Sequence, residues 1–538
     1  MNRRDDYLER REQAFQGQHQ RYFLEIRGAL SSATADIFSF EGDEAIGQES
    51  RYKISFTHTS HDLSQHEYLG KRGSLLLQFP HDPLRQLKPD PPRHKYGVVT
   101  AFSKLSSSPN QSTYEVVLES RLALLRNTPK VRFFFGMSEP DIIDQLLKEH
   151  GFNKVWARAV MKLYRSYRTR RIITQWHESD LDFLKRLCQR TGIWFFCEEG
   201  EDCEVVTIGD DLTHYRRDRA NGNRPFALPF RPESGMNTQD AESVKSLEMH
   251  AVSIPTTYHV RSYNYRHAPH PIEATEQIHG EKDDSSTYGE TSRASLAIET
   301  KEDAQREALL RREAAEAAQI EYRGTSDSWN VTPGTVLALT HHTLADAKHG
   351  LLVTRMTCSA SRKQGYKVEF TAIPSDRLYR MPLRETEWPR IEGTITGTIA
   401  STPEFSGPYL DEHGEYIVQF HDDREPRVAG LNSCRLRLGK PFAGKWQSGV
   451  HMPYIPGTEI AIAFLAGNPD LPYILHALHN SQDAAPDAAR SRPSHRGARP
   501  GRSISAASAR SAVGAIRSRT AARGDARRSR LASEPDWQ

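Results

Sequence analysis

Cysteine is scarce in this sequence. The 538 residues include five cysteines, an odd number, at scattered positions: Cys188, Cys197, Cys203, Cys358 and Cys434. Only Cys197 and Cys203 lie close together, and their spacing matches no zinc-binding pattern. We therefore expect neither a disulfide framework nor a metal site built from cysteine.

Long apolar runs are also missing. The longest, residues 460–466, has the length of one strand, whereas a membrane-spanning helix needs about 18 apolar residues. Residues 1–20 alternate in charge and lack the apolar core of a secretory signal. We expect a charged leader at 1–20, synthesis in the cytoplasm without a signal peptide, and no stable membrane insertion.

Motifs of the common enzyme classes are absent. The chain has no Gly-x-Ser-x-Gly elbow, no P-loop and no dinucleotide fingerprint followed by a helix. The serines nearest to histidines, Ser60 and Ser179, lie in turn or helix-cap contexts. We expect no catalytic residue, no cofactor and no enzyme activity.

Histidine, by contrast, is frequent, with 23 residues. His58, His61, Asp62 and His66 are neighbours in the sequence, but they lie in a loop without the HExxH spacing that places two ligands on one helix face. The pair at 341–342 follows a strand, where adjacent side chains point to opposite faces. We interpret these histidines as surface residues and expect no metal site.

Positive charge is concentrated near the C-terminus. Residues 482–538 contain twelve arginines, no lysine and five acidic residues, so they carry +7 of a chain whose formal net charge is +3, and the remainder carries −4. This segment has too few large apolar residues to bury a core, so we expect a disordered Arg-rich tail. Without aromatic residues among its arginines, specific nucleic-acid binding is not expected.

What the sequence does contain is a series of short β-rich segments. They fill residues 21–130 and, after a helix-containing part, residues 201–384. Residues 96–126 and 349–380 share one order of turn glycine, β-branched strand, polar loop, Tyr-x-Val strand and closing Leu/Arg segment. We predict two related β-barrels in one chain.

Residues 131–200 predict an insert with two helices. The first has Ser138 as its N-cap, Asp141 at the capping-box position and Gly151 at its end. The second lies in QWHESDLDFLKRLCQRTGIWFF, residues 175–196, and ends at Gly192 before an aromatic strand.

Two carboxylates begin this second helix beside His177. Ser179 is the predicted N-cap, and Asp180 and Asp182 fall in the first turn, where they meet unpaired amides and the positive end of the helix. Leu184 belongs to the buried stripe. We interpret both aspartates as capping residues, not as an active site.

Later segments predict one more helix and a small barrel. Residues 299–319 form a charged, alanine-rich helical pattern. Residues 385–480 then contain about five alternating strands, with Ile460, Ile462 and Phe464 on one face. About 90 residues of this kind suit an OB-fold barrel.

At this point the sequence resembles a known family, the spike proteins of bacterial type VI secretion systems (valine-glycine-repeat or VgrG proteins), which are related to contractile phage tail hubs and needles. The resemblance rests on four segments in order: residues 178–196, 260–269, 370–380 and 445–480. Their structural motif residues are Ser179, Asp180, Asp182, Leu184, Trp194, Phe195, Phe196, Tyr263, Tyr265, Pro374, Trp446, Gly457 and Asp470.

The resemblance implies a mainly β protein with some α: a phage-hub-like double β-barrel followed by an OB-fold barrel. It further implies a homotrimer seated on the hexameric inner tube (Hcp-type), contacts with baseplate proteins and effectors or adaptors, and secretion when the sheath contracts. A phage or prophage tail hub and a cell-wall-hydrolysing needle enzyme remain alternatives.

The resemblance also exposes a departure. Spike proteins continue into a β-helix needle with valine-glycine repeats that receives a PAAR-type cap, whereas this sequence has the disordered tail in its place. A lysine-free run of Arg, Ala, Ser, Pro and Gly is what a GC-rich gene yields out of frame. We hypothesise a truncation or frameshift after about residue 481; a coding sequence whose alternative frame lacks such repeats excludes it.

Overall fold

The computed structural model describes residues 22–78, 93–232, 242–278, 286–294, 297–342, 344–401, 407–425, 433–446 and 448–483. The predicted leader (1–20) and residues 484–538 of the predicted tail lie outside these ranges. Two compact units divide the chain, residues 1–478 and 479–538, and all elements named below belong to the first. Within the described ranges, no helix is long and apolar enough to cross a membrane.

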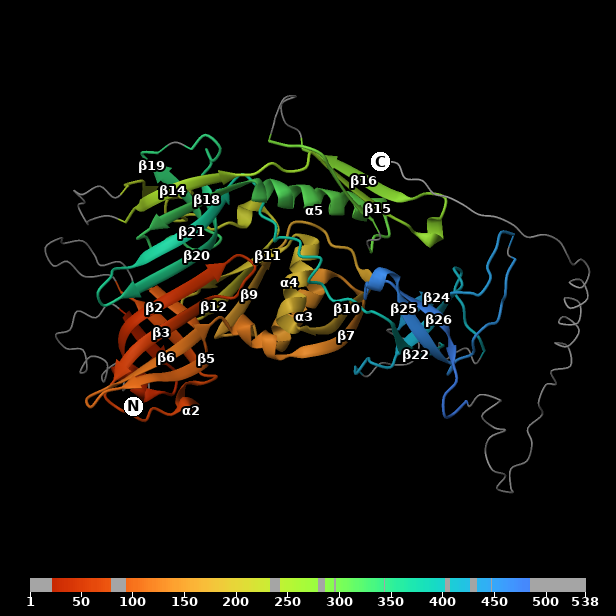
Figure 1. The fold of residues 1–538 in the computed structure, drawn as a ribbon, viewed down its shortest axis with the longest axis horizontal. Helices are drawn as coiled ribbons and strands as arrows, with labels where there is room; N and C mark the ends of the chain where they lie inside the picture. Colours follow the sequence, from red (N-terminus) through yellow and green to blue (C-terminus); the bar gives the residue numbers. More distant parts are fainter. Residues whose placement is uncertain are drawn as a thin grey trace, which may run out of the picture. The chain divides into compact units, whose positions relative to one another are not determined.

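The largest element of the fold is a 12-stranded sheet with strands from both predicted barrels (Figure 1). Its main path runs β1 (Tyr22–Ile26), β4 (Arg72–Leu77), β5 (Arg93–Ser107), β6 (Ser112–Glu119), β3 (Arg51–His58), β2 (Asp36–Ala45), β20 (Leu351–Ser361), β21 (Lys367–Pro374), β18 (Ile320–Ser326) and β14 (Val244–Ala251). Off this path, β19 (Val336–Thr340) pairs with β20 and with β13 (Phe226–Pro229).

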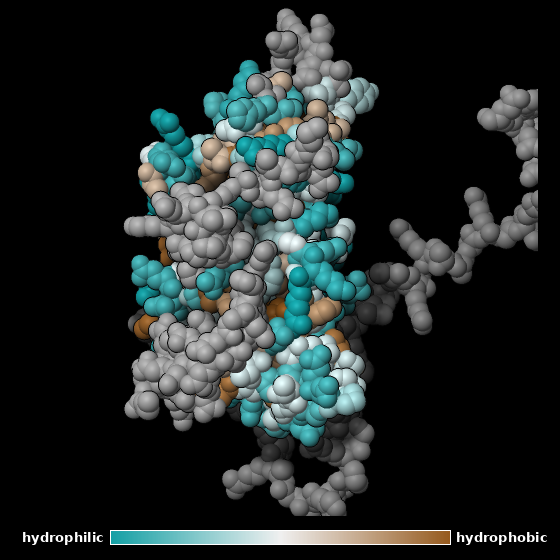
Figure 2. All heavy atoms as spheres, turned by 90° about the vertical axis from the view of Figure 1, so that its left-hand side faces the viewer, coloured by the Kyte–Doolittle hydropathy of each residue, from teal (hydrophilic) through white to brown (hydrophobic). Residues whose placement is uncertain are grey.

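The strands alternate between buried and outward positions, as a sheet with one covered face requires. In β3, Tyr52, Ile54 and Phe56 are buried, whereas the alternate residues Arg51 and Lys53 are exposed. Figure 2 faces this end of the unit and shows hydrophilic side chains over much of the coloured surface, with apolar ones scattered among them. The predicted mainly β hub fold is confirmed.

One pairing within this sheet was not predicted from the sequence. β2 lies antiparallel to β20, with Gly42 opposite Cys358, so the two predicted barrels are joined edge to edge. A Cβ atom at Gly42 would lie 2.4 Å from the Tyr52 ring and 2.7 Å from the Cys358 sulfur, which explains the glycine. Joining the two strands also removes two unpaired edges. The predicted domain boundaries remain predictions.

The insert contains two helices and two small sheets. The two predicted helices are α3 (Glu139–Glu149) and α4 (Asp180–Thr191), and they pack against each other. The sheets pair β10 (Arg170–Ser179) with β7 (Pro129–Met137), and order β11 (Trp194–Glu199), β12 (Glu204–Gly209), β9 (Ala157–Lys162) and β8 (Asn153–Lys154).

The third predicted helix is α5 (Lys301–Gln319), and it lies beneath a three-stranded sheet (Figure 1). Ala304 and Ala308 on α5 are buried against Val260 and Ile272 of that sheet. Its strands are β16 (Ile272–Gln277), β15 (Thr257–Ser262) and β17 (Glu290–Ala294). The remaining helices are short: η1 (Leu30–Thr34), α2 (Gln65–Tyr68), η2 (Arg121–Asn127), η3 (Leu212–His214), η4 (Tyr265–His267) and η5 (Leu465–Gly467).

The predicted C-terminal barrel is a five-stranded antiparallel sheet. Its order is β24 (Cys434–Arg437), β23 (Glu415–Phe420), β22 (Thr394–Ala400), β25 (Glu459–Phe464) and β26 (Pro472–Leu478). A parallel bridge between Leu438 and Ile474 joins the two edge strands, so the sheet closes on itself. Ile460, Ile462 and Phe464 are buried inside it, as expected.

The barrel core continues into the insert. The ring of Phe133 in β7 stacks on Phe420 of the barrel, with centroids 4.3 Å apart and planes within 3°. Ile172 of β10 belongs to the same buried cluster. Apolar contact therefore fixes β7 and β10 against the barrel.

Candidate functional site

Helix α4 begins as the sequence predicted. Ser179 Oγ accepts a hydrogen bond from the Asp182 N–H over 3.1 Å and donates to Asp182 Oδ2 over 2.6 Å. At the other end, Gly192 adopts a left-handed conformation (φ 77°) and its N–H reaches the Cys188 carbonyl. Leu184 is buried in the insert core. Ser179 and Asp182 are capping residues.

Asp180 does more than begin the helix. Its side chain is fully buried, and its Oδ2 atom accepts hydrogen bonds from Thr128 Oγ1 (2.9 Å), Lys130 Nζ (2.8 Å) and His150 Nε2 (2.8 Å). Oδ1 accepts from Gln175 Nε2 over 2.8 Å. Burial raises the pKa of Asp180, but the donors around it lower the pKa below the usual range. This carboxylate joins β7, β10, α3 and α4.

The capping interpretation of Asp180 is therefore incomplete, because three of its four partners lie 30 to 52 residues away and sequence spacing could not reveal them. His177 takes no part: it has a positive φ of 48° at a bulge in β10, and its exposed ring lies edge-on to Trp176. With four donors on a buried carboxylate, Asp180 offers no open face to a substrate.

The aromatic run of β11 anchors the insert. Trp194, Phe195 and Phe196 are all buried, and the Trp194 and Phe196 rings stack at 5.7 Å. A Cβ atom at Gly334 would lie 2.5 Å from the Phe196 ring, so only glycine allows this approach. The Phe195 carbonyl accepts the Gly47 N–H over 2.7 Å, tying β11 to the turn after β2.

Asp470 joins the barrel to the insert. Its Oδ1 atom accepts the backbone N–H of Thr174 over 2.7 Å, and its Oδ2 atom pairs with Arg190 of α4. Thr174 Oγ1 also donates to the Pro469 carbonyl over 3.1 Å. Burial lowers the pKa of Arg190, but Asp470 and Glu139 raise it above the usual value. The turn before β26 is thus fixed to β10 and α4.

Tyr265 marks a second junction with the barrel. Its hydroxyl donates to Glu415 Oε1, while Arg171 and Arg266 donate to Glu415 Oε2 over 3.1 and 2.8 Å. The Glu415 side chain is fully buried, and burial raises its pKa although the arginines oppose the shift. Tyr263, in contrast, points outward with 65% of its surface exposed.

Three other motif residues lie apart from these junctions. Pro374 ends β21, buried and opposite Leu351. Trp446 is 96% exposed with a left-handed φ of 58°, and Gly457 forms a turn with φ 91°. The structure therefore does not gather the sequence-predicted residues at one point.

An exposed apolar segment lies in the connection between β24 and β25. We call residues 440–456 the barrel loop. Five large apolar side chains are exposed within it: Phe442, Trp446, Val450, Met452 and Ile455. Because these exposed apolar side chains are close together in the sequence, the barrel loop is a candidate contact surface for another molecule.

The residues that form the barrel junctions include several that sequence reasoning missed, among them Arg171, Arg190 and Glu415. One signal was visible: residues 164–171 read YRSYRTRR, a basic run in a part of the chain whose net charge is negative. Such a run predicts acidic partners elsewhere in the fold.

The histidine groups behave as separate polar residues. His58 Nε2 hydrogen-bonds with Thr34 Oγ1 and His61 Nδ1 with Ser112 Oγ, each over 2.8 Å. His342 stacks on Phe230 at 4.6 Å. Among the residues that the structure describes, no three His, Cys, Asp or Glu side chains are placed to hold a metal ion.

Comparisons with known proteins agree with this architecture. The chain is similar to the type VI secretion system spike protein VgrG5 of Pseudomonas aeruginosa strain PAO1, 27% identical over 84% of this chain and 56% of that protein. VgrG1b of the same organism is 24% identical over 86% of this chain and 61% of that protein. This chain spans a little over half the length of these curated relatives.

Solved structures share the fold. The E. coli c3393 protein, described as a type VI secretion component with structural similarity to T4 bacteriophage tail proteins gp27 and gp5, is 25% identical. The match covers 85% of this chain and 99% of that one, with a TM-score of 0.59. A half-lidded Francisella PdpA-VgrG complex is 11% identical, and the match covers 91% of this chain and 83% of that one with a TM-score of 0.55. At this identity the match supports the fold alone.

The predicted resemblance to spike proteins is confirmed by these relatives. The model of the phage tail baseplate hub (GPD) family matches residues 43–364, which is more than half of the chain. That range contains the helical insert and most strands of the 12-stranded sheet, while β1, β21 and the first part of β2 lie outside it. The chain belongs to the phage tail baseplate hub family.

Proposed function

We propose that this chain is the hub of a type VI secretion spike, a homotrimer that sits on the inner tube and is ejected when the sheath contracts. The observation that carries the proposal is the match to a solved type VI component over 85% of this chain and 99% of that one. Similarity to several curated spike proteins over more than four fifths of the chain supports it.

The exposed barrel loop supports assembly into a trimer. Stable assemblies commonly bury about 2,000 Å² or more, and large apolar side chains at the centre of an interface contribute most of the binding energy. Trp446 in the barrel loop is almost fully exposed in the single chain. Burying this side chain against a neighbouring subunit would remove its apolar surface from water.

The junctions between barrel and insert support a mechanical role. A hub driven by a contracting sheath must transmit force without separating into its parts. Three contacts oppose separation here: the Phe133 and Phe420 rings, the Thr174 and Asp470 hydrogen bond, and the Arg171 and Glu415 ion pair. They combine an apolar core with two buried carboxylates, whose pairing is costly to break.

Secretion of the inner tube protein tests the proposal. We would express the chain in a bacterium whose own spike genes are deleted and measure release of inner tube protein into the medium. Restored release that disappears when the sheath gene is also deleted is the expected result. No release, although the folded chain is produced, would contradict the proposal.

A phage or prophage tail hub is a second candidate, and the match to the phage tail baseplate hub family favours it specifically. The physical role, a hub on a tube, is the same. Neighbouring genes distinguish the two: sheath, inner tube and ATPase genes indicate secretion, whereas capsid and terminase genes indicate a phage.

We also propose that the chain acts without catalysis. A cell-wall hydrolase of the needle kind needs paired carboxylates about 5 to 10 Å apart on a folded domain. After the barrel the sequence offers Asp483, Asp487, Asp525, Glu534 and Asp536, in a segment without the composition of a core. Release of peptidoglycan fragments by the purified chain would overturn this part of the proposal.

The proposed hub role also implies other binding partners, and the secretion experiment above tests them together with that role. We propose contacts with the Hcp-type inner tube hexamer, with baseplate proteins, and with effectors or adaptors. A PAAR-type cap is not part of this proposal. Pull-down with purified inner tube hexamer is the direct measurement for the first of these contacts.

A further inference from the structure

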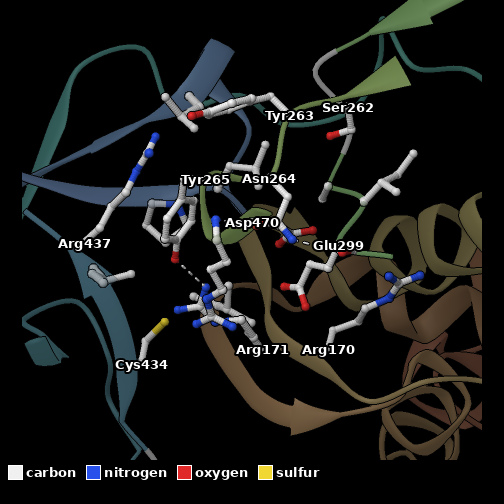
Figure 3. Close-up of a pocket in the computed structure, with 18 of the residues that line it drawn as sticks. Arg170, Arg171, Ser262, Tyr263, Asn264, Tyr265, Glu299, Cys434, Arg437 and Asp470 are labelled. Carbon is white, nitrogen blue, oxygen red and sulfur yellow. Dashed lines mark hydrogen bonds between the residues drawn. The ribbon is translucent and has the colours of Figure 1, made fainter. Parts of the chain in front are cut away.

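A pocket of about 560 Å³ lies where the insert, the β15 segment and the barrel meet. Figure 3 shows Arg170 and Arg171 entering from β10, Tyr263 and Tyr265 from the chain after β15, and Cys434 and Arg437 from β24. Its volume falls within the range of about 300–1,000 Å³ that small-molecule sites occupy. We call it the arginine pocket.

Arginine is the dominant charged residue of its lining. Seven arginines face the pocket: Arg168, Arg170, Arg171, Arg190, Arg266, Arg435 and Arg437. The first six each form an ion pair with a carboxylate, and those carboxylates are Glu139, Glu299, Asp303, Asp411, Glu415 and Asp470. Among the described residues no ion pair of Arg437 is found, so the pocket holds one positive charge in excess.

The Glu415 carboxylate attracts Arg437 electrostatically, but its hydrogen bonds come from other residues. Tyr265 already donates to one oxygen of Glu415, and Arg171 and Arg266 both donate to the other. Arg437 instead lies over the Tyr265 ring, with its Cζ atom 4.6 Å from the ring centroid. In this arrangement the N–H groups can still donate hydrogen bonds in the plane of the guanidinium group.

Arg266 has a hydrogen-bond donor that is not satisfied within the described residues. Its Nε atom is buried and has no hydrogen-bond partner among the described residues, although its Nη2 atom pairs with Glu415. Burial and the neighbouring Arg171 lower the pKa of Arg266, although Glu299 and Asp411 oppose the shift. A buried donor without an acceptor is costly, and an incoming anion would satisfy it.

The rest of the lining mixes apolar side chains with the polar Ser262, Asn264 and Thr300 and the paired carboxylates Glu299 and Asp470. Ile172, Leu436, Leu471 and Pro472 contribute to the walls. Tyr263, on the rim, presents an exposed aromatic face. A ligand suited to this site combines a negative group for the guanidinium groups with an apolar or aromatic body for the walls.

We propose that the arginine pocket binds a small organic anion, a carboxylate or a phosphate monoester carried on an aromatic body. Arg437 and Arg266 hold the anionic group, and Tyr263 packs against the ring. This binding goes beyond the hub role and does not depend on it, since the pocket is complete within one chain.

Isothermal titration of the full chain tests the proposal, with phenyl phosphate, benzoate and inorganic phosphate as probes. We expect one binding site per chain for phenyl phosphate or benzoate. The probe with the higher affinity shows whether the site prefers a phosphate or a carboxylate. Arg437→Gln should weaken binding about tenfold, as loss of a charge-assisted hydrogen bond does. Arg355→Gln, an exposed arginine of β20 paired with Asp43, is the matched control and should change nothing.

A second variant tests the proposal even if Arg437→Gln disturbs the fold. Tyr263→Ala removes an exposed ring, so it should leave the thermal unfolding temperature unchanged. It should weaken the binding of phenyl phosphate but not the binding of inorganic phosphate. The proposal fails if no probe binds the folded chain at millimolar concentration. It fails equally if Arg355→Gln weakens binding as much as Arg437→Gln, or if inorganic phosphate binds as tightly as phenyl phosphate.

Discussion

The backbone N–H of Thr174 donates to Asp470 Oδ1 over 2.7 Å, although 296 positions separate the two residues. The second oxygen of the same carboxylate pairs with Arg190 of α4. One aspartate in the turn before β26 thus holds both a strand and a helix of the insert. It is one of three contacts that hold the barrel to the insert, beside the Phe133 and Phe420 rings and the Arg171 and Glu415 ion pair.

Removing the charge of Asp470 should weaken this attachment. Asp470→Asn leaves Arg190 buried without its counter-charge, and breaking a buried pair from one side costs about 3 kcal/mol or more. Urea unfolding measures the loss. Asp422→Asn, on an exposed turn of the same barrel, is the control and should stay within about 0.5 kcal/mol of the parent.

The aromatic strand β11 supplies a second prediction. Phe195→Ala should lower the free energy of unfolding by about 3–5 kcal/mol, because the ring is almost fully buried in the insert core. Phe38→Ala, at a more exposed phenylalanine of β2, should cost less than about 1 kcal/mol. Similar losses for both variants would show that Phe195 is not part of the core.

Glu204 gives the stability a pH dependence. Burial raises the pKa of Glu204 to about 7, even though Ser120 and the Arg121 N–H donate to its carboxylate. The folded state therefore binds a proton more tightly than the unfolded state. The stabilisation is present in full below the unfolded pKa of about 4.5 and is lost as pH rises toward 7.

The free energy of unfolding measured at pH 5 and at pH 8 checks whether stability falls as the pH rises. The parent chain should lose stability on the order of 3 kcal/mol from Glu204 between these conditions, and Glu204→Gln should lose correspondingly less. Equal losses in the two proteins would show that Glu204 does not titrate differently in the folded state.

The barrel loop supplies a prediction about assembly. Trp446→Ala should lower the solution mass of the assembly without lowering the unfolding temperature of the single chain, since the ring is exposed there. The control is Tyr288→Ala, an exposed aromatic residue outside the loop. An unchanged mass for Trp446→Ala would remove this loop from the interface.

Local sequence rules predicted the helices well. Ser138 with Asp141, and Ser179 with Gly192, act within one or two turns of the backbone, so the caps follow from neighbouring residues alone. The barrel strand around Ile460 follows in the same way from alternation.

Long-range pairing was beyond those rules. The partners of Asp180, the attachment of Asp470 to Thr174 and the β2–β20 edge pairing each join distant segments. A carboxylate in a first turn has the same sequence signature whether it faces water or, like Asp180, is buried and accepts hydrogen bonds from four donors. Only the fold distinguishes the two cases.

Solution mass by light scattering coupled to size exclusion tests the central claim most directly. A trimeric hub predicts a mass near 183 kDa, three times the 61.1 kDa of one chain. A mass near 61 kDa at the concentrations used for assembly would contradict the account, because a monomer cannot form a closed ring on the inner tube.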